Sequence, residues 1–277
     1  MNVIFVGFVV ILGAIIGSFL NVVIARYNTG MSFLSGRSMC FSCGKTLVWY
    51  ELIPVVSFLA QRGRCRSCTS AISRQYLLVE LFTAAVFVAV FLKDLSVAVI
   101  AYHLMVFSAL VVIGVYDFKH KIIPDGAVYF FITLSFVGLL FVHSGYVALP
   151  MIDAPLLRDF VGGPLIALPF AGLWYFSKGA WIGFGDAKLA LGMGWFLGLE
   201  QAFFAVTIAS WIGAAVGIVL IALGKIPGVS ARFRHFTAKS EIAFGPFLVI
   251  EIGIVPEVDI LRNGNTGNDR PNRKHDK

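Results

Sequence analysis

Two short acidic segments carry the residue types that acid–base chemistry needs. The first covers residues 117–125 and follows a long apolar run. The second covers residues 183–189, where Asp186 and Lys188 stand at the start of another apolar run. A carboxylate beside a membrane-type segment is costly unless it is paired or used. We therefore predict that Asp117 and Asp186 meet and form a catalytic pair.

Two adjacent carboxyl groups share a proton, because both cannot ionise cheaply at close range. One can then act as a base on a water molecule while the other acts as an acid toward a scissile carbonyl group. Gly183 and Gly185 would allow close backbone approach beside Asp186. Asp125 and Lys188 are supporting candidates. Lys188 either keeps Asp186 ionised or is an interfacial lysine that extends toward the headgroups.

Each acid also has a purely structural interpretation. Asp125 and Asp186 could be helix N-caps, a position that suits aspartate. Asp117 could be an interfacial charge paired with Lys119 or Lys121. The pattern Gly-x-Gly-Asp is weak by itself, and it lacks the preceding strand and full glycine pattern of a phosphate loop. These residues alone do not decide between a catalytic role and a structural role for the aspartates.

Four cysteines form two Cys-x-x-Cys pairs in one basic loop. The pairs are Cys40 with Cys43 and Cys65 with Cys68, and 21 residues separate them. Such knuckles suit a tetrahedral sulfur site, for which zinc is the expected metal, and four protein ligands leave no open position. The metal would therefore be structural and coupled to folding of the loop. Gly44 and Gly63 would give the turns room, and reduced cysteines or local disulfides are the alternative.

The composition indicates a membrane protein. Of 277 residues, 58% are hydrophobic and 13% are charged, whereas a soluble domain is about 25% charged. The net charge of +7 could suggest nucleic acid, but basic loops also mark the cytoplasmic side and headgroup contacts. We expect no nucleic-acid partner. The first apolar run lacks a basic start and a cleavage site, so we expect a retained span.

The apolar runs predict an all-α polytopic membrane protein with seven to eight transmembrane helices and a cytoplasmic four-cysteine zinc-type loop. A helical span needs roughly 20 apolar residues. The expected segments are 3–25, 76–92, 96–116, 126–142, 160–176, a short 188–199, 201–223 and a marginal 242–255. The loop at 26–76 is cytoplasmic by its positive charge, with the N-terminus outside. Counting spans then places both acidic segments on the cytoplasmic face.

The chain resembles the type IV prepilin peptidases, also called leader peptidase/N-methyltransferases. The resemblance rests on the order of several short motifs. They are residues 17–26, the cysteine loop with 53–54 and 62–66, Tyr76, Glu80, residues 117–125, residues 183–189 and residues 244–247. No serine-hydrolase or zinc-protease motif competes with them.

The resemblance implies an aspartic endopeptidase of the bacterial inner membrane. It would remove the leader peptide of type IV prepilins or type II secretion pseudopilins at the cytoplasmic face. The two catalytic aspartates of the family fall on Asp117 and Asp186. The cysteine loop belongs to the bifunctional branch, so N-methylation of the new terminus with S-adenosylmethionine is expected too. Membrane lipid is the other expected partner.

This interpretation divides the chain into four parts: a first helix at 1–25, the cysteine loop at 26–76, a membrane-embedded peptidase domain at 77–255 and a polar basic tail at 256–277. Two positions depart from the family pattern. Lys119 stands where many members have an acid, and Tyr27 begins a stretch that lacks an early proline. Glu51 and Glu80 are candidates to offset repulsion between the basic loops and a basic leader.

Two other function classes fit part of the pattern. An ion-coupled transporter could use Asp117 and Asp186 as a proton or cation relay. A zinc-stabilised membrane scaffold without catalysis is the third possibility. Both acids lie at one face rather than at the membrane midplane, and a cysteine loop has no evident transport role. The peptidase is therefore the favoured interpretation.

Overall fold

The computed structural model describes residues 3–93, 95–141 and 157–225. Within these ranges the chain is helical, and its only β-type pairings are two isolated bridges in the cysteine loop. The elements are α1 (Val3–Arg26), η1 (Trp49–Glu51), α2 (Val56–Ala60), α3 (Arg74–Phe91), α4 (Val97–His120), α5 (Asp125–Phe141), α6 (Leu157–Ser177), α7 (Phe184–Leu197) and α8 (Leu199–Lys225). The predicted eighth span at 242–255 and the tail at 256–277 lie outside the described residues.

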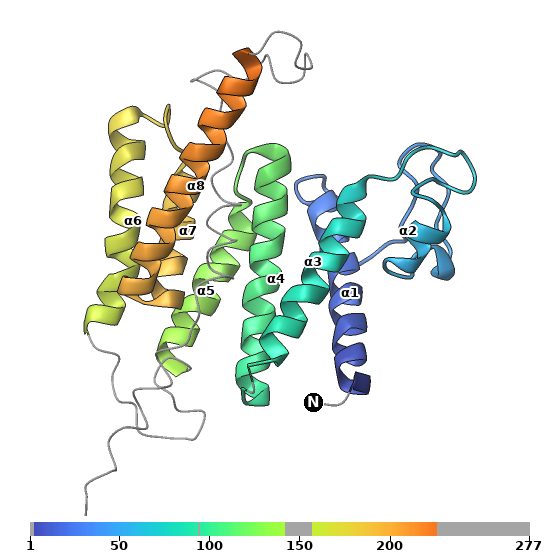
Figure 1. Ribbon diagram of the computed structural model, residues 1–277, viewed down its shortest axis with the longest axis horizontal. Coiled ribbons are helices and arrows are strands. Elements are labelled where there is room, and N and C mark those ends of the chain that lie inside the picture. The colour runs from blue at the N-terminus through green and yellow to red at the C-terminus, as the bar shows by residue number, and fades with distance from the viewer. Residues whose placement is uncertain (1–2, 94, 142–156, 226–277) are drawn as a thin grey trace, which may run out of the picture.

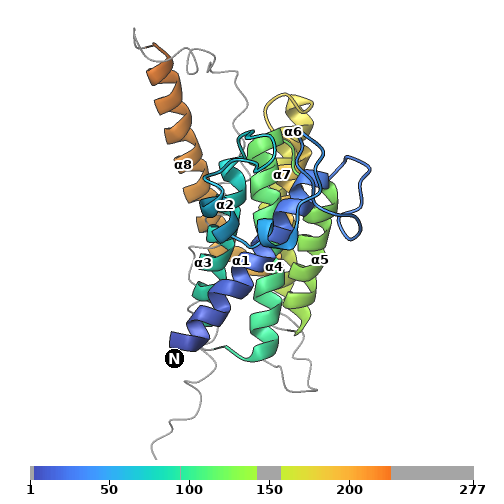
Figure 2. The same ribbon diagram turned by 90° about the vertical axis from the view of Figure 1, so that its right-hand side faces the viewer.

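Seven of these helices form a bundle in which successive helices run in opposite directions, while α2 lies in the cysteine loop (Figure 1; Figure 2). Five helices, α1, α3, α4, α6 and α8, are long and apolar enough to cross a membrane. The shorter α5, with 17 residues, and α7, with 14 residues, complete the seven membrane helices expected before the marginal eighth. The predicted fold class is thereby confirmed for the described part of the chain.

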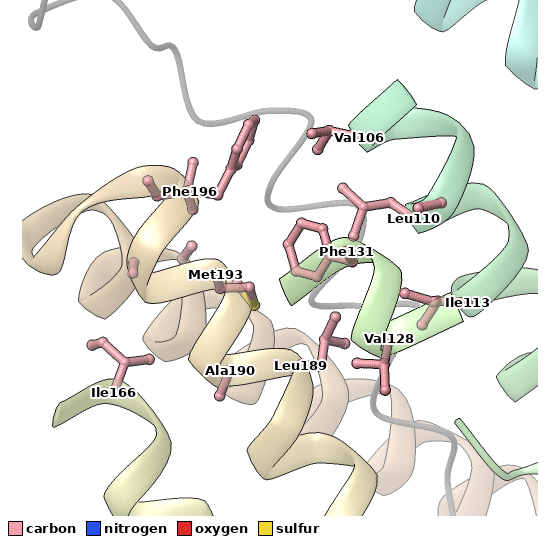
Figure 3. Packing of buried hydrophobic residues seen from close by; sticks show 14 of the residues in the cluster. Val106, Leu110, Ile113, Val128, Phe131, Ile166, Leu189, Ala190, Met193 and Phe196 are labelled. Atoms are coloured by element: carbon pink, nitrogen blue, oxygen red, sulfur yellow. The ribbon is translucent and has the colours of Figure 1, made fainter. Parts of the chain in front are cut away.

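The larger packing cluster joins α4, α5, α6, α7 and α8. Its fully buried members include Leu110 and Ile113 of α4, Phe131 of α5, and Leu189 and Met193 of α7 (Figure 3). Lipid tails are as apolar as these side chains, so close packing rather than a hydrophobic driving force holds such helices together. Glycines on α6 and α7 allow this closeness, since a Cβ added to Gly194 would lie 2.6 Å from the Gly162 oxygen.

A second cluster joins α1 and α3 to the C-terminal half of α4. It contains Leu20 and Ile24 of α1, Val79 of α3, and Val111 and Tyr116 of α4. Because α4 belongs to both clusters, this helix is packed on two sides along the part that directly precedes its last turn. That turn and the first turn of α7 lie at the same end of the bundle (Figure 1), as the counting of spans predicted.

Candidate active site and metal centre

Asp117 lies in the last turn of α4 and is only 5% exposed. The helix continues past it to His120 and ends at Lys121, which has a left-handed backbone with φ of 55°. The N–H of Lys121 donates to the Asp117 carbonyl oxygen at 2.6 Å. The chain therefore reverses at Lys121, about one helical turn after Asp117, and residues 122–124 lead into α5.

The reversal presses Ile123 against the first turn of α7. Ile123 is buried, and a Cβ added to Gly185 would lie 2.8 Å from the Ile123 Cβ. Real Cβ atoms do not come this close to a neighbour, so Gly185 is needed for close approach of the two segments. Gly183 differs, because its added Cβ would meet only ordinary contact, 3.6 Å from the Asp186 Oδ2.

Asp186 is the third residue of α7. Gly183 takes the N-cap position, and the Asp186 N–H donates to the Gly183 carbonyl oxygen at 3.2 Å. The N-cap interpretation of Asp186 is therefore wrong. The side chain is partly buried, and the charge of Asp117 acts on its carboxyl group. The close approach of Ile123 and Gly185 thus brings together the two segments that hold the predicted aspartates.

Lys188 contacts Asp125 rather than Asp186. Its Nζ donates to the Asp125 Oδ1 at 2.6 Å, and it also lies over the rings of Tyr129, 4.8 Å away, and Phe184, 5.4 Å away. Because Lys188 pairs with Asp125, the structure does not support the interpretation that Lys188 keeps Asp186 ionised by direct pairing. Asp125 is the first residue of α5, so the ion pair links the first turns of α5 and α7 beside the two aspartates.

Tyr27, immediately after α1, is a positioning residue that the sequence reasoning missed. Its hydroxyl accepts the Gly126 N–H at 2.7 Å, and its ring stands edge-on to Tyr116 with centroids 5.2 Å apart. It therefore ties the end of α1 to the start of α5. The sequence carries only a weak signal for this contact: Tyr27 opens a stretch without an early proline, which does not by itself indicate a partner in α5.

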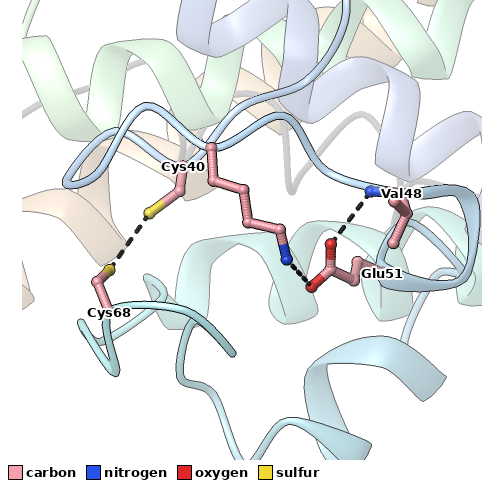
Figure 4. Close-up of polar contacts among 5 residues, drawn as sticks. Cys40, Val48, Glu51 and Cys68 are labelled. Carbon is pink, nitrogen blue, oxygen red and sulfur yellow. Dashed lines mark hydrogen bonds and ion pairs between the residues drawn. The ribbon is translucent and has the colours of Figure 1, made fainter.

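The four cysteines of the loop form one cluster. All four are free thiols, and their Sγ atoms lie within 4.8 Å of one another. The Sγ atoms of Cys40 and Cys68 are 3.8 Å apart (Figure 4). A tetrahedron with metal–sulfur distances of about 2.3 Å has edges of about 3.8 Å. The cluster could therefore hold a metal ion, and it excludes local disulfides in this structure.

The two knuckles repeat the same hydrogen bonds. Cys40 accepts from the Gly44 N–H and donates to Lys45, and Cys65 accepts from Thr69 and donates to Ser70, each bond 2.9 Å long. Thr69, with φ of 56°, occupies the place that Gly44, with φ of 70°, takes in the first knuckle. Gly63, with φ of 66°, lies in the turn between α2 and the second knuckle rather than inside the knuckle, and its N–H donates to the Phe58 carbonyl oxygen at 2.9 Å.

Hydrogen bonds favour the ionised form of two of the four thiols, Cys40 and Cys68, whereas hydrogen bonding to Cys68 and burial raise the pKa of the Cys43 thiol to about 11. Hydrogen bonding from the Cys43 backbone lowers the pKa of the Cys40 thiol to about 6, and hydrogen bonding to Ser70 lowers the pKa of Cys68. Metal ions bind the thiolate. The donor set therefore suits a soft, thiolate-bound cation.

Glu51 and Glu80 are both used inside the protein. Glu51 accepts the Val48 N–H and pairs with Lys45, each at 3.1 Å (Figure 4), which holds the pKa of the Glu51 carboxyl below its usual value. Glu80 accepts the Val55 N–H at 2.7 Å. Each is 6% exposed. Neither presents an open surface charge to a leader peptide, so the suggested offsetting role is not supported.

Comparison with known proteins identifies the family. Residues 11–93 match the bacterial peptidase A24 N-terminal domain, and residues 104–218 match the type IV leader peptidase family. No solved structure matches.

Three relatives carry the name prepilin leader peptidase/N-methyltransferase. The protein from Myxococcus xanthus is 34% identical over 80% of this chain and 65% of its own length. The protein from Bacillus subtilis is 30% identical over 78% of this chain and 83% of its own length. The protein from Burkholderia pseudomallei is 32% identical over 87% of this chain and 81% of its own length. None of the three names describes a transporter. The predicted resemblance is confirmed: the chain belongs to the type IV leader peptidase family.

Proposed function

We propose that this protein is a membrane aspartic endopeptidase that removes the leader peptide of type IV prepilins or type II secretion pseudopilins. The observation that carries the proposal is the close approach of the segments that hold Asp117 and Asp186. They are 69 positions apart in the chain, yet the contact between Ile123 and Gly185 brings their helix ends together. Family membership and the shared name of the relatives support the same activity.

In the proposed reaction one aspartate is ionised and the other protonated. The carboxylate takes a proton from water as the water oxygen bonds to the scissile carbonyl carbon, and the protonated aspartate gives its proton to the carbonyl oxygen. The carbon–nitrogen bond then breaks as the leaving amine takes a proton from the aspartate that received it from water. The other aspartate takes back a proton from one of the two hydroxyl groups on the carbon, which leaves the new carboxylic acid and restores the pair. Placing two carboxyl groups together is what keeps one of them protonated.

The supporting residues act through position. Gly185 lets Ile123 approach, so that the reversal after α4 reaches α7, whereas Gly183 is the N-cap before α7 and contributes only its backbone. Asp125 and Lys188 join the first turns of α5 and α7. Together they fix the backbone on both sides of the pair, and a displacement of about 1 Å at such a site can cost 100-fold in rate.

We assign a structural zinc ion to Cys40, Cys43, Cys65 and Cys68. Thiolate chemistry and the spacing of the sulfur atoms support zinc, and the metal would organise the loop rather than take part in cleavage. The second half of the relatives' name suggests N-methylation of the new terminus, which needs a methyl donor such as S-adenosylmethionine. We assign no residues to that donor.

The proposed setting is the inner membrane of a bacterium, with the N-terminus outside and the aspartates at the cytoplasmic face. The basic charges of the loop between α1 and α3 support this orientation. The proposal keeps the division of the chain into four parts, with boundaries after residues 25, 76 and 255.

The test is direct processing of a prepilin with a short basic leader. Membranes that contain this protein are mixed with the prepilin, and mass spectrometry reports the new N-terminus and its methylation. We expect a single cut that removes the leader, followed by one added methyl group. An intact prepilin, together with acid-dependent ion flux in proteoliposomes, would favour the transporter instead.

A further inference from the structure

One segment of the cysteine loop exposes large apolar side chains. It covers residues 49–60, which contain η1 and α2, and is called the interface segment below. Trp49 is 76% exposed, Val56 60% and Leu59 61%, and Leu52 and Ile53 are also exposed. Contiguous exposed apolar patches of this kind mark a contact with a membrane or a partner.

The depth of this segment is fixed by Glu80. Glu80 accepts the Val55 N–H at 2.7 Å, one residue before α2 begins. Glu80 lies six residues after Arg74, the first residue of α3, which corresponds to about 9 Å along the helix. Both residues lie in a helix that is long and apolar enough to cross a membrane. The start of α2 is therefore level with the membrane-type part of α3.

The packing of α1 against Glu80 indicates the same depth for the interface segment. Gly17 packs against Glu80, since a Cβ added to Gly17 would lie 2.8 Å from the Glu80 Cα. Gly17 is nine residues before Arg26, the end of α1, or about 14 Å along that helix. Both views show α2 beside the bundle, below the level at which α4 ends (Figure 1; Figure 2). The loop thus folds back along the spans.

The charges near the segment complement a lipid surface. Arg62, Arg64 and Arg66 are exposed and follow α2 directly. Arg66 also lies over the Tyr50 ring, 5.2 Å from its centroid. Apolar side chains followed by arginines form the usual pattern of a segment that lies in the membrane interface, where basic residues contact anionic headgroups.

We propose that the interface segment inserts into the lipid leaflet that surrounds the first turns of α3, with the three arginines at anionic headgroups. The polar backbone fits this setting, because Glu80 satisfies a Val55 N–H that would be costly to leave unpaired at membrane depth. Val55 holds a φ of 61°, which is unusual for a β-branched residue. The loop is thereby fastened to the membrane as well as to α3. This goes beyond the proposed peptidase activity.

The experiment uses Trp49 as the reporter in the full chain. The other four tryptophans, Trp174, Trp181, Trp195 and Trp211, are changed to phenylalanine, and the protein is placed in nanodiscs that contain anionic lipid. Interfacial segments bury their apolar face about 5–10 Å deep, so bromines near the top of the acyl chains should lower Trp49 fluorescence roughly twofold. Acrylamide in the water should quench it weakly. If the fourfold variant is unstable, the difference between the wild type and Trp49→Phe gives the same quantity.

A matched pair of substitutions separates insertion from simple proximity. Leu59→Asp should abolish quenching by brominated lipid and expose Trp49 to acrylamide. Leu34→Asp changes another exposed leucine of the same loop, outside the interface segment, and should leave both signals unchanged. Strong acrylamide quenching of the Trp49 protein in lipid would overturn the proposal.

Protection of Trp49 only after a prepilin is added would also overturn it, because the surface would then be a substrate site. Either result leaves the proposed peptidase intact as long as the protein still cleaves a prepilin.

Discussion

The four cysteines are brought together by the turns of one loop, whereas the two aspartates are brought together by helices that are distant in the sequence. Each knuckle closes through hydrogen bonds within six residues. Asp117 and Asp186 instead depend on the end of α4, the reversal at Ile123 and the first turn of α7. Damage to the cysteine site should therefore unfold only its own loop. The aspartate site should lose activity whenever a contact between its helices is disturbed.

The largest effect is expected for loss of the metal. Cys65 is the buried member of the cluster, and Cys65→Ser should release the ion, since structural zinc contributes on the order of 10 kcal/mol to folding of such units. Zinc content and limited proteolysis of the loop measure the loss, with the neighbouring Ser67→Ala as control. The membrane helices of the Cys65→Ser protein should still resist the protease. A loop that resists protease equally well after chelation would argue against structural zinc.

The next effect concerns the contact on which the aspartate site depends. Gly185→Ala places a Cβ against Ile123, and overpacking of this kind costs about 1–3 kcal/mol. We expect prepilin cleavage to fall at least roughly tenfold, because the pair loses its geometry. Gly183→Ala is the matched control and should cleave normally, since its Cβ has room. Equal rates for the two variants would mean that the close approach does not set the geometry.

A smaller effect is expected at the ion pair between α5 and α7. Asp125 is largely exposed, and pairs of this kind contribute up to about 1 kcal/mol. Asp125→Asn should therefore slow cleavage roughly threefold to fivefold. The exchanged pair, Asp125→Lys with Lys188→Asp, should recover much of the rate. If the exchanged protein is slower than either single variant, the two residues do not act as a pair.

The smallest effect is expected in the second knuckle. Thr69 holds a left-handed backbone that glycine holds in the first knuckle, and this conformation costs a non-glycine residue about 1–2 kcal/mol. Thr69→Gly should strengthen zinc retention in a chelator competition, and Gly44→Thr should weaken it. A weaker site in Thr69→Gly would show that the Thr69 hydroxyl, which donates to the Cys68 oxygen at 2.7 Å, outweighs the strain.

The spans and the cysteine cluster followed from the sequence because their signals are local. Apolar runs gave the helices to within a few residues, and the Cys-x-x-Cys spacing gave the cluster. The end of α4 differs: the prediction stopped at residue 116, but the helix continues to His120 because Lys121 provides a left-handed end. Asp117 therefore belongs to a helix rather than to a loop.

The contacts around the aspartates did not follow from the sequence. The partner of Lys188 is Asp125, 63 positions away, and nothing local separates this carboxylate from that of Asp186. The hydrogen bond from Gly126 to Tyr27 spans 99 positions. Such contacts arise from how α1, α5 and α7 pack, which hydrophobic patterns alone do not specify.

The most direct test of the central claim compares Asp117→Asn, Asp186→Asn and the double variant in prepilin cleavage. Because the two carboxyl groups act as one unit, we expect all three proteins to show the same residual rate, with zinc content and thermal stability close to those of the wild type. Full processing by either single variant, or losses that multiply in the double variant, would contradict the account.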